Sequence, residues 1–308
     1  MRRKKIVTGT RGSRLALWQA NEISRSLKSA HPSLDVEIEV IKTRGDKILD
    51  VALSKIGDKG LFTKEIESAL LDGSIDIAVH SLKDLPTELP DGLAIGAVLP
   101  RGEVRDVLLT SDGSMRDDFF DNCVIATSSL RRRSQILNFK EHIKVIDIRG
   151  NVDSRIKKME SGYCDALLMA GAGIERLGYH SKIAAYMDPM IVTPAVSQGA
   201  VAVEIREDDE EIIEILDSVN DFATWQQVMA ERAFLRTMEG GCQIPVACYS
   251  KVKNDSITLY GMVASLDGTN VLRDSEIACG ENVAEKAVEL AFRMLDNGGR
   301  EILEDIRV

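Results

Sequence analysis

Short apolar runs alternate with longer amphipathic stretches along most of the chain. The runs at 6–10, 36–41 and 75–80 contain β-branched residues and are typical of strands. Residues 13–30 and 61–73 place their apolar side chains at helical spacing, and the second of these stretches ends at a glycine. Strand–helix alternation of this kind predicts an α/β fold built on largely parallel sheets.

The alternation continues through the middle of the chain and changes near residue 220. Further strand-like runs, each beside a helical segment, lie at 124–128, 145–150, 165–173 and 201–205. A long helix is predicted over 224–239, followed by three strands and another helix, with a hairpin turn at 267–269. We therefore expect a separate α+β domain from about residue 220.

Composition narrows the class of function. The chain has 308 residues, 44% of them hydrophobic, and a formal net charge of −10. This acidic balance argues against nucleic acid as a partner, because phosphate contacts need a basic face. No run approaches the roughly 18 apolar residues of a membrane span, and the basic start lacks the apolar segment of a secretory signal. We expect a cytoplasmic protein.

Among the five cysteines, Cys242 is in an unusual sequence context. In the cytoplasm the cysteines should be reduced, and their odd number without a C-x-x-C pair predicts neither a disulfide framework nor a metal site. By residue type alone a cysteine is most often a small buried hydrophobe. Gly240 and Gly241 precede Cys242, however, which indicates a loop that other parts of the protein can approach closely.

Arginines gather at predicted strand-to-helix turns. Residues 126–137 place Ser128 and Ser129 at the N-cap, followed by Arg131, Arg132 and Arg133 in the first helical turn. Cations are unfavourable at that end of a helix. We therefore interpret the turn as an anion site, in preference to a solvated basic face or an import signal.

Two other turns have the same arrangement. Their polar residues are Arg11, Ser13 and Arg14 in the first, and Arg149 and Arg155 in the second. Open α/β sheets bind ligands at the carboxyl ends of their strands, so the three turns predict one crevice. Arginine suits planar carboxylates, and the predicted ligand is a polycarboxylate.

Two segments are ambiguous from their residues alone. Residues 42–60 combine glycines with basic residues. This composition fits a solvated surface loop and a mobile lid equally well. Asp84 lies in a turn closed by Pro86. Its carboxylate could stabilise a positive charge or move a proton, although capping a turn is the commoner role.

Eight segments, taken in order, resemble the porphobilinogen deaminase (hydroxymethylbilane synthase) family of tetrapyrrole biosynthesis. They read GTRGSRLALWQA, KTRGDK, KGLFTKEIE, DIAVHSLKDLPTELP, TSSLRRRSQIL, IRGNVDSRI, AVSQGAVAVE and EGGCQIPVACY. The resemblance covers about 6–250, and the remainder fits the family's C-terminal domain. It implies a transferase that condenses four porphobilinogen molecules head to tail, with loss of ammonia, into the linear tetrapyrrole hydroxymethylbilane.

The resemblance also implies roles for individual residues. Cys242 of the E-G-G-C-Q motif carries a dipyrromethane cofactor through a thioether, and Asp84 is the catalytic carboxylate. The carboxylates of cofactor and substrate are held by Arg11, Ser13, Lys83, Ser129, Arg131, Arg132, Arg149, Arg155 and Arg176. Supporting positions are Ser81, Thr127 and Gln198, and the lid loop includes Lys55, Lys59 and Phe62. No metal is implied.

The implied fold has three domains, and the family is typically monomeric. Two lobes resembling those of periplasmic binding proteins take 1–99 with 200–217 and 100–199, and an α+β domain at 220–308 presents Cys242 to the cleft. The sequence departs from the family's usual residues at a few positions. Ala126 and Ser197 replace glycines, and Asp153-Ser154 interrupts the common N-V-x-T-R pattern. None of these removes a group that the reaction needs.

A two-lobed module that binds a polycarboxylate without turnover is the alternative. The arginine turns alone allow it. Such a module needs neither Cys242 nor Asp84, and these two residues therefore distinguish the two functions.

Overall fold

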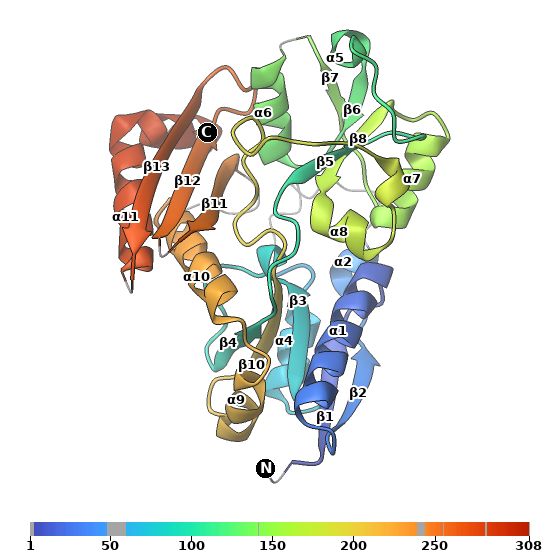
Figure 1. Cartoon of the computed structure of the whole chain (residues 1–308), viewed down its shortest axis with the longest axis vertical. Coiled ribbons are helices and arrows are strands. Elements are labelled where there is room, and N and C mark those ends of the chain that lie inside the picture. The colour runs from blue at the N-terminus through green and yellow to red at the C-terminus, as the bar shows by residue number, and fades with distance from the viewer. Residues whose placement is uncertain are drawn as a thin grey trace. The chain divides into compact units, whose positions relative to one another are not determined.

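A computed structural model describes residues 3–47, 60–140, 142–238, 244–254, 256–280 and 282–307. Within them the chain forms two compact units (Figure 1). Unit 1 contains residues up to 102 together with 199–225, and unit 2 contains 103–198 together with 226 onward. The chain therefore leaves unit 1 after Gly102 and re-enters it at Gly199.

Unit 1 is built on a five-stranded sheet in the order β2-β1-β3-β10-β4. These strands are β1 (Lys5–Thr10), β2 (Asp35–Val40), β3 (Ile77–Ser81), β4 (Leu93–Val98) and β10 (Val201–Arg206). β1 pairs in parallel with β2 and β3, whereas β10 runs antiparallel to β3 and β4. The segment that re-enters unit 1 at Gly199 therefore supplies β10, which is an interior strand of this sheet.

Helices cover both faces of this sheet. Successive side chains of a strand point to opposite faces, and residues along β3 accordingly alternate between two apolar clusters. Ile77 and Val79 pack with residues of α1 (Arg14–Ala30) and α9 (Glu210–Asp217). Ala78 packs instead with α4 (Lys64–Leu71). The short helices α2 (Arg44–Lys47) and η1 (Leu82–Asp84) complete the described part of the unit.

Unit 2 contains a second five-stranded sheet, in the order β7-β6-β8-β5-β9. Its strands are β5 (Asp106–Leu109), β6 (Val124–Ala126), β7 (Lys144–Ile146), β8 (Ala166–Ala170) and β9 (Ile183–Tyr186). β6 is parallel to β7 and β8, and β5 is antiparallel to β8 and β9. The two sheets therefore share one pattern, in which an antiparallel strand follows three parallel ones. The α/β class and the two lobes are confirmed.

The helices around the second sheet follow its strands along the chain. They are α5 (Phe119–Asn122), α6 (Leu130–Phe139), α7 (Val152–Glu160), α8 (Gly171–Arg176) and the short η2 (His180–Lys182). The apolar residues of the sheet again divide between two clusters, one containing Ile156 of α7 and the other Ile136 of α6.

The rest of unit 2 is an antiparallel three-stranded sheet with helices. The helix α10 (Phe222–Thr237) leads into β11 (Val246–Lys253), β12 (Ser256–Ala264) and β13 (Val271–Cys279), then α11 (Val283–Met294), η3 (Leu295–Gly299) and α12 (Arg300–Arg307). A Cβ at Gly261 of β12 would lie 2.8 Å from the Phe234 ring and 2.6 Å from the Met294 sulfur, so only glycine allows this packing. The separate C-terminal α+β arrangement is confirmed, while the boundaries of a three-domain division stay a prediction.

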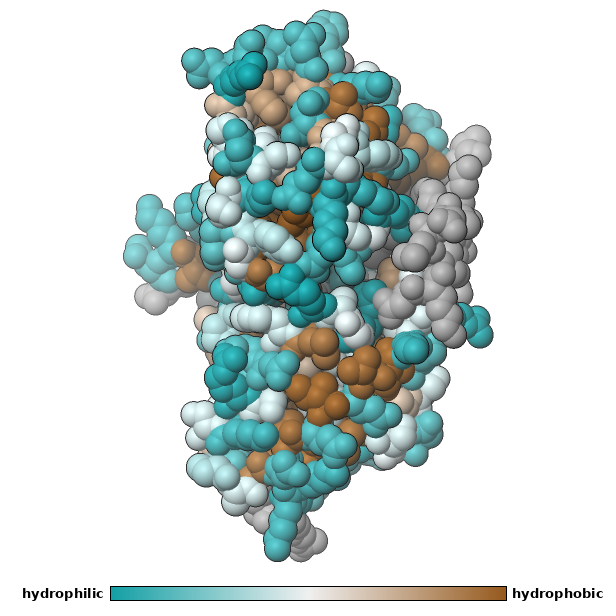
Figure 2. All heavy atoms as spheres, turned by 90° about the vertical axis from the view of Figure 1, so that its right-hand side faces the viewer, coloured by the Kyte–Doolittle hydropathy of each residue, from teal (hydrophilic) through white to brown (hydrophobic). Residues whose placement is uncertain are grey.

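One face of the molecule is mainly polar (Figure 2). Figure 2 shows hydrophilic side chains over most of one face, with apolar side chains gathered on the part that unit 1 forms. Within the described ranges, every helix is too short or too polar to cross a bilayer.

Candidate active site

The arginine-bearing turns lie where strands end and helices begin. The turn with Arg11 joins β1 to α1 in unit 1. The turns with Arg131 and Arg149 join β6 to α6 and β7 to α7 in unit 2. Because β6 and β7 are parallel neighbours, their turns share one edge of the sheet. A single crevice for all three turns stays a prediction.

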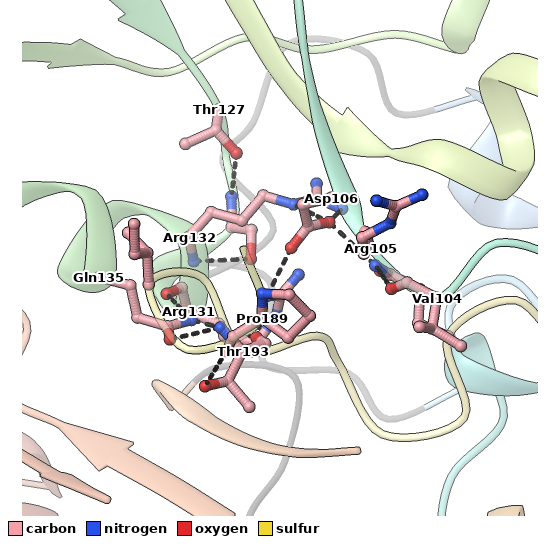
Figure 3. A network of polar contacts seen from close by, with 12 residues as sticks. Val104, Arg105, Asp106, Thr127, Arg131, Arg132, Gln135, Pro189 and Thr193 are labelled. Carbon is pink, nitrogen blue, oxygen red and sulfur yellow. Dashed lines mark hydrogen bonds and ion pairs between the residues drawn. The ribbon is translucent and has the colours of Figure 1, made fainter. Parts of the chain in front are cut away.

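The polar centre of unit 2 is Asp106, the first residue of β5 (Figure 3). Nη1 of Arg131 donates to its Oδ2 at 2.7 Å, and Arg132 donates to its Oδ1 through Nε at 3.0 Å and Nη2 at 2.8 Å. Nε2 of Gln198 donates to the same Oδ1 at 3.0 Å. The exposed fractions are 0% for Asp106, 6% for Arg131 and 8% for Arg132. The two predicted ligand-binding arginines thus converge on one buried carboxylate.

The cluster carries an excess positive charge in a buried place. Burial alone raises the pKa of Asp106, but the charges and hydrogen bonds of Arg131 and Arg132 outweigh burial and hold this pKa well below its usual range. Two guanidinium charges against one carboxylate leave one positive charge uncompensated within the trio. A buried charge is stable only when it is paired, so this arrangement favours an anionic ligand.

Neighbouring groups fix the direction of Arg131. Its Nη1 also donates to the Thr193 carbonyl at 2.6 Å. Gln135, one turn further along α6, donates to that carbonyl at 3.2 Å and accepts from the Thr193 N–H at 2.8 Å. The adjacent Arg133 is half-buried, and among the described residues its guanidinium donates to the Val145 carbonyl, at 3.5 Å. Consecutive arginines of α6 therefore have different surroundings.

The three hydroxyl residues before α6 have separate roles. Ser129 is the N-cap, and its side chain accepts from the Arg132 N–H at 3.4 Å. The prediction that Ser128 also caps α6 was wrong. Its Oγ donates to the Ile148 carbonyl and accepts from the Ile148 N–H at 3.1 Å. Ser128 therefore joins the turns after β6 and β7. Oγ1 of Thr127 accepts from the Ser129 N–H at 3.3 Å.

The turn after β7 places two arginines beside the N-terminus of α7. Asn151 caps this helix by accepting from the Ser154 N–H at 2.9 Å. Nε of Arg155 donates to the Gly150 carbonyl at 2.7 Å, and the Arg149 carbonyl accepts from Nζ of Lys158 at 3.1 Å. Arg149 and Arg155 are half-buried, as is Arg176 at the end of α8.

At Asp153-Ser154, where the sequence departs from the family's usual pattern, both side chains form hydrogen bonds. Asp153 accepts from the Tyr179 hydroxyl at 2.6 Å. Oγ of Ser154 donates to the Asn151 carbonyl at 3.0 Å. The other departures lie at Ala126, which ends β6, and at Ser197.

Unit 1 holds the predicted catalytic carboxylate. Asp84 ends η1 directly after β3 and is exposed, while Lys83 and Ser81 are half-buried. The Ser81 hydroxyl accepts from Nε2 of Gln19 at 2.7 Å. The backbone N–H of Leu82 donates to the Ala200 carbonyl at 3.1 Å, so the returning strand fixes the start of this turn.

Arg11 and Phe62 are brought together in the same unit. The guanidinium carbon of Arg11 lies 4.2 Å from the centroid of the Phe62 ring, a cation–π geometry. Gly45 makes room for the ring, since a Cβ there would come within 2.1 Å of it. Ser13 caps α1 by accepting from the Ala16 N–H at 3.2 Å. The other lid residues, Lys55 and Lys59, lie outside the described residues.

Cys242 also lies outside the described residues. The cysteines that are described are Cys123, Cys164 and Cys248, which are buried, and Cys279, which is exposed. Within the described part of the chain, no three His, Cys, Asp or Glu side chains gather where a metal ion could bind.

The role of Asp106 was not predicted from the sequence. The available signal was a charged residue at the start of the otherwise apolar strand Asp106–Leu109, because a buried carboxylate needs a cationic partner. Gln135 and Glu231 were not predicted either, because their partners are distant in sequence.

Comparison with known proteins assigns the family. The sequence model for "Porphobilinogen deaminase, dipyromethane cofactor binding domain" matches residues 6–214, and that for the family's C-terminal domain matches 225–296. The porphobilinogen deaminase of Desulforamulus reducens is 47% identical over 307 residues, 98% of each chain. That of Carboxydothermus hydrogenoformans is 47% identical over 305 residues, covering 99% of this chain and 98% of the relative.

Solved structures show more distant likeness. The BvgS periplasmic VFT2 domain of Bordetella pertussis has a TM-score of 0.40 and 14% identity over 70% of this chain and 85% of its own. Substrate-binding domain 2 of Lactococcus lactis GlnP has a TM-score of 0.43 and 11% identity over 71% and 89%. At these scores the assignment rests on the sequence matches alone.

The matched models define a class of proteins with a dipyrromethane cofactor-binding domain. Both models and the nearly full-length relatives carry one family description. The chain belongs to the porphobilinogen deaminase family.

Proposed function

We propose that this chain is a porphobilinogen deaminase that works as a monomer in the cytoplasm. It condenses four porphobilinogen molecules, with loss of one ammonia from each, and water then releases the linear chain as hydroxymethylbilane. The buried cluster of Arg131, Arg132 and Asp106 carries this proposal, because an acidic protein has concentrated positive charge at the end of β6. Porphobilinogen carries an acetate and a propionate, and each condensation adds two more carboxylates to be held.

The residues at the ends of β6 and β7 fit a dipyrromethane. Their guanidinium and hydroxyl donors, together with the N-termini of α6 and α7, suit the carboxylate side chains of such a group. Arg131, Arg132, Ser129, Arg149 and Arg155 would hold it, with attachment through a thioether to Cys242. When bound, the dipyrromethane supplies a free pyrrole α carbon as the primer for chain growth.

Asp84 acts on the positive charge that develops in the substrate. When porphobilinogen loses ammonia, its methylene carbon and pyrrole ring share a positive charge. A carboxylate beside the ring N–H stabilises that charge and can accept a proton from the ring. Asp84 is at the surface directly after β3, and Lys83 beside it binds a substrate carboxylate.

Arg11, Ser13 and Arg176 bind further carboxylates of the substrate and the growing chain. The contact of Arg11 with the Phe62 ring holds the guanidinium plane in one orientation, which favours bidentate recognition. Ser81, Thr127 and Gln198 support these groups through the hydrogen bonds described above. Lys55, Lys59 and Phe62 belong to a lid loop over the substrate.

Asp84→Asn tests the proposal. An amide cannot offset a positive charge, so we expect turnover to fall by about 10²-fold or more while the protein stays folded. Ammonia release and tetrapyrrole formation from porphobilinogen measure turnover. Asp91→Asn, at another exposed aspartate of unit 1, is the matched control and should retain wild-type turnover.

The outcomes separate the two candidate functions. Normal turnover in Asp84→Asn removes Asp84 from the mechanism. A wild-type protein that binds porphobilinogen but releases no ammonia favours the binding module instead.

A further inference from the structure

Ser197 has an unusual backbone for its residue type. Its φ is 60°, in the left-handed region, which is unfavourable for a residue with a Cβ. The residue is fully buried, and its backbone N–H donates to Oε2 of Glu231 at 2.7 Å. A conformation of this kind persists only when its surroundings hold it, and the Glu231 carboxylate is the group placed to do so.

Glu231 lies in α10 and is itself fully buried. Its second oxygen, Oε1, accepts from the backbone N–H of Ser250 at 2.8 Å and from the Ser250 hydroxyl at 2.6 Å. Ser250 belongs to β11. One carboxylate therefore fixes two segments to α10, the turn at Ser197 and the strand β11.

The residue after Ser197 connects this turn to the arginine cluster. Gln198 is fully buried, and its Nε2 donates to Oδ1 of Asp106 at 3.0 Å and to the Val104 carbonyl at 2.8 Å. The same Oδ1 accepts both hydrogen bonds from Arg132. A chain of contacts thus leads from Glu231 through Ser197, Gln198 and Asp106 to the arginines.

We propose that Glu231 is a positioning residue for the carboxylate-binding arginines. It holds Ser197 in the left-handed conformation, which directs Gln198 onto Asp106 and so sets where Arg131 and Arg132 present their guanidinium groups. That these arginines bind porphobilinogen-derived carboxylates rests on the proposed function, whereas the coupling between Glu231 and Ser197 does not.

A carboxylate is required because all the described donors point toward it. Three of the hydrogen bonds that its two oxygens accept come from Ser197 and Ser250, two from backbone N–H groups and one from a hydroxyl. A glutamine side chain has one acceptor oxygen. Its NH₂ group would therefore face the donor of Ser197 or those of Ser250, and the hydrogen bonds on that side would be lost. Ser197→Gly has the opposite effect, because glycine adopts positive φ without strain and needs no anchor.

The test is a double-variant series of Glu231→Gln, Ser197→Gly and the two combined. We expect Glu231→Gln to raise the KM for porphobilinogen about tenfold with a smaller change in kcat, since misdirected arginines weaken carboxylate binding. In the combined variant most of this increase should disappear. Ser250→Ala, which removes a donor on the β11 side, is the matched control: Ser197→Gly should not reverse any effect that it has.

Urea unfolding of the same variants provides a measurement without substrate. We expect the destabilisation by Glu231→Gln to be smaller in the Ser197→Gly background, so that the two effects are not additive. If Glu231→Gln does not fold, Glu231→Asp replaces it, because the shorter carboxylate keeps the charge but cannot reach both segments.

The possible results lead to different conclusions. A KM increase that persists undiminished in the combined variant, or no KM increase at all, overturns the positioning role and leaves the proposed function intact. If the wild-type chain does not turn over porphobilinogen, the proposed function fails. Non-additive unfolding energies then still support the coupling, and additive ones overturn it.

Discussion

Nη1 of Arg131 and Oδ2 of Asp106 lie 2.7 Å apart, and both side chains are shielded from solvent. Arg131 is at the N-terminus of α6, where the helix dipole opposes a positive charge. The carboxylate from β5 compensates for that charge, and Arg132 shares the same carboxylate. The helix can therefore place two guanidinium groups at the carboxyl end of β6.

Asp106→Asn should strongly destabilise the protein. The substitution leaves two buried guanidinium groups without their countercharge, and breaking a buried ion pair costs about 3–5 kcal/mol. Urea denaturation at pH 7 measures this loss, with Asp91→Asn as the exposed control. A loss no larger than that of the control contradicts the role assigned to Asp106.

The same pair predicts a pH dependence of stability. The pKa of Asp106 is lower in the folded protein than its unfolded value of about 3.9. Its contribution to the free energy of unfolding is thus fully present above that value and is lost as the pH falls toward the folded pKa. The difference between wild type and Asp106→Asn should therefore shrink as the pH falls below about 4. A difference that grows on acidification contradicts this assignment.

Arg131→Leu and Arg133→Leu should behave differently. Arg131 contacts the buried carboxylate and the Thr193 carbonyl, whereas Arg133 makes one long contact with Val145. We expect Arg131→Leu to remain folded, because Arg132 still pairs with Asp106, but to lose activity. Arg133→Leu should keep most of its activity. Steady-state rates, with circular dichroism to check folding, distinguish the two, and equal losses contradict the orientation of α6.

The described cysteines should differ in their reaction with iodoacetamide at pH 8. Burial, with the nearby Asp165 charge, raises the pKa of both Cys123 and Cys164 to about 11, so few of these thiols ionise. Cys279 is exposed and should be alkylated about 10²-fold faster, because the thiolate is the reactive form. In urea the difference should vanish. Equal rates in the native protein count against the burial of Cys123 and Cys164.

The sequence was sufficient to predict the alternating elements and the arginine turns. Hydrophobic periodicity determines which face of α1 or α4 is buried, and a cation at a helix N-terminus is visible as a local anomaly. Ser129 could be assigned as a cap because capping depends on neighbouring residues.

The remaining features depend on tertiary structure. Asp106 is 25 residues from Arg131, and Ser197 is 34 residues from Glu231. Neither pairing leaves a local pattern, because the antiparallel insertion of β5 decides which residues Asp106 meets. Ser128 was misassigned for the same reason: its partner Ile148 belongs to the turn after the neighbouring strand β7.

We propose that Cys242 carries a covalent dipyrromethane, and the mass of the intact chain tests this proposal most directly. Denatured in acid and weighed, the purified protein should exceed its sequence mass by one dipyrromethane unit. Digestion and fragmentation should place the addition on Cys242 and not on Cys248, and Cys242→Ser should lack both the addition and the activity. A thioether, unlike a disulfide, is not cleaved by thiols, so the addition should persist after treatment with thiols. An enzyme that forms the tetrapyrrole at its unmodified sequence mass contradicts the account.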